Sequence, residues 1–305
     1  MNAILTWLND FLYIYILVAL LTAAGIYFTV VTKGVQFRLL KEGLRTLTEK
    51  KASDRGISSF QALMISTASR VGTGNIIGVS TAIAVGGPGA VFWMWLMALL
   101  GAASAFCEST LAQIYKIKSG DKFLGGPAYY IQRGLGKKGL GVLYAVLLII
   151  CSSTAMILLV SGVEGNAANA GSPYMQQAVF HMFGETGIHI VTVALMLFAF
   201  TTLLGNYFYA EQNLKFITEN SKALFVFRIV ALVIIFIGTH VGFEMAWNIT
   251  DILMALVAIV NILAVFAMRR PVIAALKNYD KARKTTDEPV FRAADIGLTD
   301  TDCWK

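Results

Sequence analysis

A run of polar and small residues interrupts a segment that is otherwise long and apolar enough to cross a membrane. The segment extends from Ser58 to Gly86, and near its middle stands Arg70-Val71-Gly72-Thr73-Gly74-Asn75. A membrane-spanning helix needs about 20 mostly apolar residues, and glycine makes such a helix easy to unwind. Unwound backbone is tolerated at membrane depth only inside protein or beside a cavity. The run therefore predicts a broken helix, either a binding site or a glycine-rich kink.

The composition of the chain places it in the membrane. Hydrophobic residues make up 57% of the sequence and charged residues 14%, whereas a soluble domain carries about 25% charge. Strands with the alternating pattern of a membrane barrel are not found, so we expect an all-α polytopic membrane protein. About seven transmembrane helices are predicted, at residues 11–32, 58–86, 89–115, 140–162, 188–210, 222–242 and 246–268.

The basic residues predict the orientation of the chain. The chain has 25 lysines and arginines, and all of them except Arg70 fall in 33–55, 116–138, 215–228 or after residue 268. These segments all lie on one side of the predicted spans, and positive loops face the cytoplasm. We therefore expect a multi-pass protein of a bacterial-type cytoplasmic membrane, with the N-terminus outside and the C-terminus cytoplasmic. Topology explains the net charge of +7, so no nucleic-acid partner is needed.

The sequence offers no chemistry for catalysis or metal binding. Its three cysteines form no CxxC pair and no cluster with the three histidines, which argues against a disulfide framework or a zinc site. Ser/His/Asp, HExxH and P-loop patterns are also missing from the sequence. We expect a protein that is not an enzyme and uses no cofactor.

Several motifs in order along the chain carry a family resemblance. They are VGTGNIIGVSTAIAVGGPGAVFWMW (71–95), GGPAYYIQRGLG (125–136), STAMILLVSGV (153–163), LFAFTTLLGNYFYAEQ (197–212) and EPVFRAADIGLTDTDCW (288–304). Together they strongly resemble the sodium:alanine/glycine symporters, an amino acid carrier family. The resemblance implies a LeuT-type fold, in which one extra helix precedes two inverted repeats of five helices. It also implies symport of alanine or glycine with sodium, or with protons in some members.

The chain departs from this family by lacking a long middle section. That section carries the second broken helix of the LeuT-type fold. The seam lies near Ile149–Ser152, so the resemblance implies an incomplete inverted-repeat fold. We divide the chain into the extra N-terminal helix with a basic cytoplasmic loop (1–57), a first-repeat remnant with the broken helix (58–150), a second-repeat remnant (151–268) and a cytoplasmic C-terminal tail (269–305).

The resemblance also assigns site residues. The second half of the broken helix presents a positive N-terminal end that suits a substrate carboxylate, and freed carbonyls suit sodium. The alternative for the residues of the span 188–210 is helix-to-helix hydrogen bonding. The expected substrate contacts are Thr73, Gly74, Asn75, Thr202 and Asn206, and the expected sodium contacts are Val71, Gly72 and Thr201.

Charged residues inside the spans need partners or a cavity. We expect Arg70 to act as a cytoplasmic gate or to pair with a carboxylate, unless its side chain reaches the aqueous surface. Glu108 is the other charged residue predicted inside a span, and we expect it to pair with Arg70 or with neighbouring backbone groups. Asp251 and Glu211 lie closer to helix ends and are expected to be solvated. Tyr129-Tyr130 is expected at the membrane interface.

Two functions follow from these observations. The first is secondary active symport of a small neutral amino acid with sodium across the bilayer. The alternative is a shortened remnant that does not transport, or that binds an intact carrier, because alternating access needs two repeats that move against each other. The sequence does not fix the oligomeric state.

Overall fold

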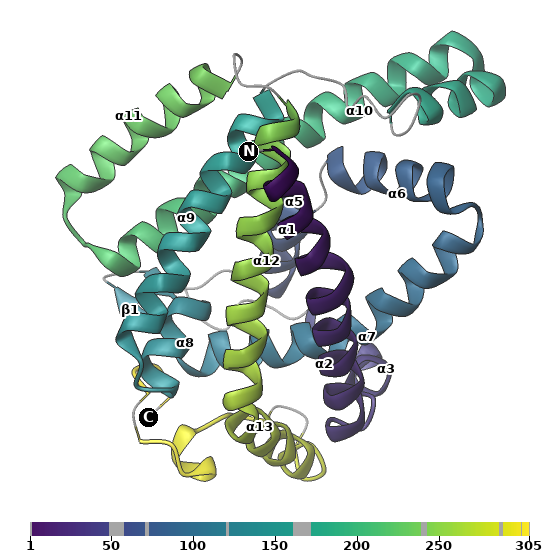
Figure 1. Cartoon of the computed structure of the whole chain (residues 1–305). Helices are drawn as coiled ribbons and strands as arrows, with labels where there is room; N and C mark the ends of the chain where they lie inside the picture. The colour runs from purple at the N-terminus through teal and green to yellow at the C-terminus, as the bar shows by residue number, and fades with distance from the viewer. Residues whose placement is uncertain are drawn as a thin grey trace.

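The computed structural model is mostly helical (Figure 1) and describes residues 2–48, 58–70, 73–119, 122–160, 172–238, 243–286, 289–299 and 301–304. The helices of the first part of the chain are α1 (Asn2–Asp10), the π-helix η1 (Phe11–Leu17), α2 (Val18–Val31), α3 (Val35–Arg38), α4 (Leu40–Thr46), α5 (Ser59–Arg70), α6 (Thr73–Gly86) and α7 (Gly89–Ile114).

The second part of the chain begins with two short strands, β1 (Ile117–Ser119) and β2 (Lys122–Leu124). They pair as an antiparallel hairpin, a small addition to an otherwise helical architecture. The hairpin is small because only three residues pair on each side. It is followed by α8 (Pro127–Gly134), α9 (Lys138–Val160), α10 (Ser172–Ile217), α11 (Ser221–Gly238), α12 (Phe243–Ala267), α13 (Arg269–Ala282) and the 3₁₀ turn η2 (Ala293–Ile296).

Four helices of the described residues are long and apolar enough to cross a membrane: Leu5–Val31, Gly89–Ile114, Val179–Ile217 and Asn248–Ala267. They correspond to four of the seven predicted spans. The predicted span 188–210 belongs to a longer helix, α10, which has a non-helical residue at Gly184. The complete count of seven stays a prediction.

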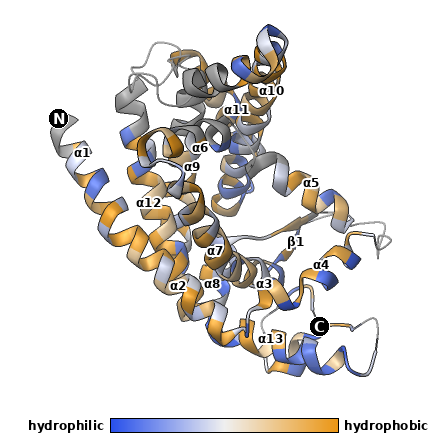
Figure 2. Cartoon of the chain, turned by 90° about the vertical axis from the view of Figure 1, so that its right-hand side faces the viewer, coloured by the Kyte–Doolittle hydropathy of each residue, from blue (hydrophilic) through white to orange (hydrophobic). Residues whose placement is uncertain are grey.

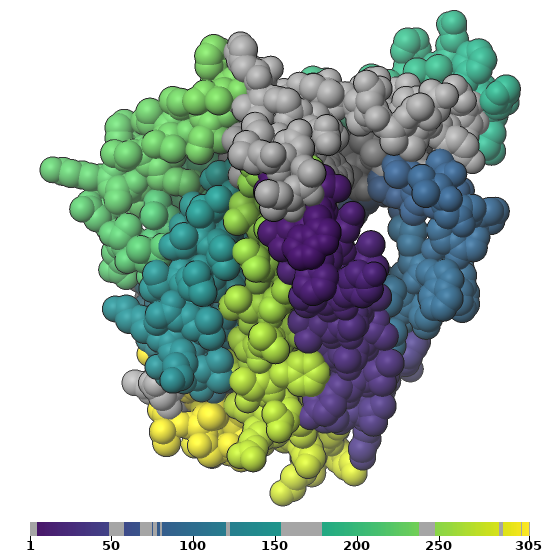
Figure 3. Space-filling view, in the orientation of Figure 1, coloured from purple at the N-terminus to yellow at the C-terminus, as the bar shows by residue number. Residues whose placement is uncertain are grey.

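The centre of the molecule is a helical bundle. In Figure 3, α12 lies between α9 on one side and the continuous rod of α1, η1 and α2 on the other. Hydrophobic residues run along α2, α9 and α12, while hydrophilic residues gather on α13 (Figure 2). Large apolar side chains such as Trp93 and Phe236 are 63% and 71% exposed, as suits a surface that faces lipid.

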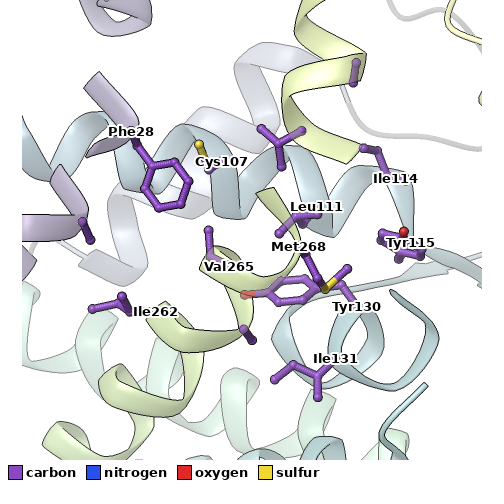
Figure 4. Packing of buried hydrophobic residues seen from close by; sticks show 14 of the residues in the cluster. Phe28, Cys107, Leu111, Ile114, Tyr115, Tyr130, Ile131, Ile262, Val265 and Met268 are labelled. Atoms are coloured by element: carbon purple, nitrogen blue, oxygen red, sulfur yellow. The ribbon is translucent and has the colours of Figure 1, made fainter. Parts of the chain in front are cut away.

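The most deeply buried part of the bundle lies where α7, α8 and α12 meet (Figure 4). Tyr130 and Ile131 of α8 are fully buried there beside Leu111 and Met268. The Tyr130 hydroxyl points toward α12 and donates a hydrogen bond to Asn261 Oδ1. The expectation that Tyr129-Tyr130 lies at the membrane interface is therefore wrong, because both rings pack in the core.

Glycines form two of the connections that shape the bundle. Gly87 adopts φ +70° between α6 and α7, a left-handed conformation that glycine adopts readily, so the chain turns tightly there. Gly126 adopts φ +120° directly before Pro127. Proline favours the first turn of a helix, so α8 begins there.

The C-terminal tail is fastened to the end of α7. Trp304 Nε1 donates a hydrogen bond to the carbonyl oxygen of Gln113 at 2.7 Å. The ammonium of Lys116 lies 4.4 Å from the Trp304 ring centre, and burial lowers the pKa of this lysine. Asp302 also pairs with Arg133 of α8 at 2.9 Å. The tail residues Asp302 and Trp304 therefore join α7 to α8.

Candidate transport site

The expected broken helix consists of two separate helices. The first, α5, ends at Arg70, and the second, α6, begins at Thr73. Val71 and Gly72 lie outside the described residues, and so do the side chains of Arg70 and Thr73. The first N–H groups of α6 have no intrahelical partner, and the backbone of Gly74 and Asn75 belongs to this first turn. The Asn75 side chain is exposed.

Both halves of this interrupted segment pack against α10. The helices that carry the expected substrate residues are therefore neighbours. On α10, the Thr201 hydroxyl donates to the carbonyl oxygen of Phe198 at 3.1 Å, which leaves its lone pairs free to accept. Thr202 Oγ1 is buried and has no hydrogen-bond partner within the described structure. Asn206 is half-buried one turn further along the helix.

The Thr202 hydroxyl is the feature of α10 that most needs an explanation. A buried hydroxyl without a partner costs about 1–3 kcal/mol, and such groups are rare in folded proteins. The helix-joining interpretation of this threonine predicts a hydrogen bond to a neighbouring helix, and no such bond forms among the described residues. A ligand oxygen or nitrogen would satisfy the group.

Glu108 lies on α7 directly after Cys107 and three residues before Leu111, both of which belong to the buried core. It is half-buried, and its carboxylate lies near Tyr130 of α8 and Tyr144 of α9. The carboxylate therefore stands where α7, α8 and α9 meet. The expected pairing with Arg70 falls outside the described residues, because the arginine side chain is not among them.

Glu211 is not solvated, which corrects the sequence-based expectation. Its exposed fraction is 9%, and it accepts from Lys215 at 2.7 Å and lies 3.6 Å from Arg228 of α11. The Tyr207 hydroxyl also donates to it. The contacts within α10 could have been predicted from the sequence, because a spacing of four residues places Tyr207, Glu211 and Lys215 on one helix face. The contact with Arg228 could not.

Asp251 is also held by other polar groups. Asn9 Nδ2 lies 3.4 Å from both Asp251 Oδ2 and Asn248 Oδ1, and the Tyr13 hydroxyl donates to the Asp251 carbonyl at 3.3 Å. These contacts join α1 and η1 to α12 across more than 230 residues of sequence. No local pattern predicts a pairing between such distant segments.

Comparison with known proteins assigns this arrangement to a family. A sequence model described as the sodium:alanine symporter family matches residues 1–150 and 147–293. The chain belongs to this family. Its two matches meet at residues 147–150, beside the seam expected near Ile149–Ser152. Symporters carry solutes across membranes and are not enzymes.

Curated relatives of the family are longer than this chain. The probable sodium/glutamine symporter GlnT of Bacillus subtilis is 30% identical over an alignment of 437 positions, which includes 93% of this chain and 91% of the relative. The amino-acid carrier protein AlsT of the same organism is 28% identical over 457 positions, which include 100% of this chain and 98% of the relative. Since this chain has 305 residues, it lacks an internal section that these carriers possess.

Proposed function

We propose that this chain binds a small neutral amino acid together with sodium and carries out their symport across the cytoplasmic membrane. The observation that carries the proposal is that the interrupted segment α5–α6 packs against α10. The chain also belongs to the sodium:alanine symporter family. Broken helices form substrate and ion sites in many secondary transporters. Alanine and glycine are the proposed substrates.

The proposed site joins the first turn of α6 to the middle of α10. Thr73, Gly74 and Asn75 receive the substrate carboxylate through backbone N–H groups and the Asn75 amide, because helix N-termini favour anions. Thr202 and Asn206 face the substrate from α10. The sodium ligands are oxygens of Val71, Gly72 and Thr201, since a hard cation prefers oxygen donors. Arg70 and Glu108 form the gate.

The same proposal sets the fold and the orientation. The chain adopts an incomplete LeuT-type arrangement of about seven transmembrane helices, with the domain boundaries derived from the sequence. The N-terminus is outside and the C-terminus is cytoplasmic. The end of the molecule where α2, α7 and α12 finish, and where α13 and the tail lie, is then the cytoplasmic end.

A second candidate function is binding without transport, alone or beside an intact carrier. The observation that favours it is the missing middle section relative to GlnT and AlsT. Alternating access needs two repeats that rock about a shared site, and in this proposal the second repeat lacks its broken helix.

The deciding experiment is sodium-dependent uptake of labelled alanine by the purified chain in liposomes, with AlsT in parallel. Symport predicts uptake above that of empty liposomes, lost when sodium is replaced by choline and lost in Asn75→Ala. Sodium-dependent alanine binding without uptake favours the second candidate. A folded chain that neither binds nor transports alanine contradicts both.

Thr202→Val tests the role of α10 separately from stability. Valine has the shape of threonine without the hydroxyl, and Oγ1 has no partner among the described residues, so the thermal stability should be kept or raised. Uptake or binding of alanine should fall at least tenfold if the hydroxyl contacts the ligand. The matched control is Thr192→Val on the same helix, where the hydroxyl is exposed and bonded to Ile188 O at 2.9 Å.

A further inference from the structure

Three of the apolar helices that are long enough to span a membrane end at one end of the molecule. They finish at Val31, Ile114 and Ala267, and we infer one boundary of the bilayer at these three helix ends. The amphipathic helix α13 begins two residues after the last of them and carries buried Val272 and Leu276 on one side. This helix therefore lies at the level where hydrocarbon gives way to headgroups.

An apolar pocket of about 450 Å³ opens at this level. Its walls come from the last turns of α7, from α13 and from the tail, with Phe106, Ala275, Val290 and Trp304 among the lining residues. The volume falls within the range of about 300–1,000 Å³ that is usual for small-molecule sites. The lining is almost entirely apolar, so a hydrocarbon chain fits its chemistry and a polar solute does not.

A second hollow, of about 750 Å³, adjoins the apolar pocket and shares Leu39 and Tyr279 with it. Its lining contains five basic and two acidic side chains: Arg38, Lys41, Arg45, Arg283 and Lys284 against Glu42 and Asp280. The acidic groups are already used, because Asp280 pairs with Arg38 at 2.6 Å and Glu42 pairs with Arg45 at 2.8 Å.

Two cations of this hollow remain for a ligand. Lys41 and Lys284 are exposed and form no ion pair within the described structure. The hollow therefore has a net positive charge and two free ammonium groups beside the mouth of an apolar pocket. Basic clusters at the end of a transmembrane helix attract anionic headgroups, whereas an apolar pocket alone does not select between lipids.

We propose that these two adjoining hollows form a binding site for one anionic glycerophospholipid. One acyl chain occupies the apolar pocket between α7, α13 and the tail, and the phosphate lies against Lys41 and Lys284. The site is separate from the proposed transport site and does not depend on transport. Because the tail supplies one wall, bound lipid also holds the tail against α7.

The test measures lipid retention by the purified full chain in detergent, using native mass spectrometry. The probes are dioleoyl phosphatidylglycerol and dioleoyl phosphatidylcholine, which share acyl chains and differ in charge. We expect one tightly held phosphatidylglycerol and weaker retention of phosphatidylcholine. Lys41→Gln with Lys284→Gln should weaken phosphatidylglycerol binding about tenfold to thirtyfold, since each lysine near a membrane surface contributes attraction.

The matched control is Lys277→Gln with Lys281→Gln. These exposed lysines lie on α13, at the same end of the chain as Lys284, and neither lines either hollow. The control should keep the preference for phosphatidylglycerol. Equal losses in the two double variants would indicate general attraction to a basic surface and overturn the proposal. Equal retention of the two lipids by the unaltered chain would also overturn it, as would an equal thermal shift with water-soluble glycerol phosphate.

A fluorescence measurement locates the acyl chain. Brominated acyl chains quench tryptophans on contact, and Trp304 lines the apolar pocket. One equivalent of brominated phosphatidylglycerol should quench the unaltered chain more than Trp304→Phe. Equal binding and equal quenching in the two proteins would show that the chain lies elsewhere and would overturn the proposal.

Discussion

Gly25 allows α2 and α7 to approach closely, and adding a single methyl group there should separate them. A Cβ atom at Gly25 would lie 2.7 Å from Leu100 Cβ and 2.9 Å from the Leu100 carbonyl oxygen. Carbon atoms pack best at about 3.5–4.0 Å, so the helices must shift. Small residues at such crossings are a common means of helix association in membranes.

The expected magnitude follows from two opposing effects. Overpacking costs about 1–3 kcal/mol, while alanine stabilises a helix relative to glycine by about 0.5–1 kcal/mol. Gly101 lies directly after Leu100 on α7, and a Cβ there would meet no heavy atom within 4 Å among the described residues. Gly101→Ala should therefore raise the free energy of unfolding only by the higher helix propensity of alanine. The difference in unfolding free energy between the two variants isolates the close approach, at about 1–3 kcal/mol.

The assay is reversible unfolding in mixed micelles, with helicity followed by circular dichroism as the denaturing detergent is increased. Gly25→Ala should unfold at a lower detergent fraction than Gly101→Ala. Equal midpoints, or a more stable Gly25→Ala, would refute the reasoning, because the two helices would then not touch at this point. Since α7 also carries Glu108 and the attachment of the tail, Gly25→Ala should loosen both.

Three further outcomes are expected. Trp304→Ala removes the hydrogen bond to α7, so protease should cut the tail at Arg292 faster than in the unaltered chain; unchanged cutting would contradict the attachment. Glu211→Gln removes the charge that faces Lys215 and Arg228 and should lower the free energy of unfolding by about 1–3 kcal/mol, seen as a lower melting temperature in detergent. The Tyr279 hydroxyl that donates to Glu42 lowers the pKa of this carboxyl, with Arg45 and Arg283 adding to the effect. Stability from this group is complete above the ordinary glutamate pKa of about 4.3 and is lost as the pH falls through the lowered value, so Glu42→Gln should flatten the acid limb of a stability profile.

Local signals in the sequence were sufficient to predict the interruption in the segment 58–86. Glycine, threonine and asparagine within an apolar segment predicted the interruption, and separate helices end at Arg70 and begin at Thr73. The turns before α7 and α8 also depend on local signals, because glycine conformation at Gly87 and Gly126 and the position of Pro127 act over a few residues. The family and the missing middle section followed from several ordered motifs.

Contacts between distant segments were not predictable in this way. Glu211 was expected in solvent because the sequence places it near the end of a predicted helix. Arg228 of α11 comes close to it only in the folded chain. Tyr130 was expected at the membrane interface, because a tyrosine in sequence gives no indication that residues of α7 and α12 will pack around it. The substrate and sodium residues remain predictions, since ligand binding depends on the relative placement of α6 and α10 side chains.

The fastening of the tail also has a consequence for the order of biosynthesis. Trp304 and Gln113 are 191 residues apart in the chain, and ribosomes add about 5–20 residues per second. Trp304 is therefore synthesised roughly 10–40 s after Gln113 at the end of α7. During that interval Lys116 and the last carbonyls of α7 are open to water, lipid or a chaperone. Completion of the fold at this end is thus timed by translation of Trp304.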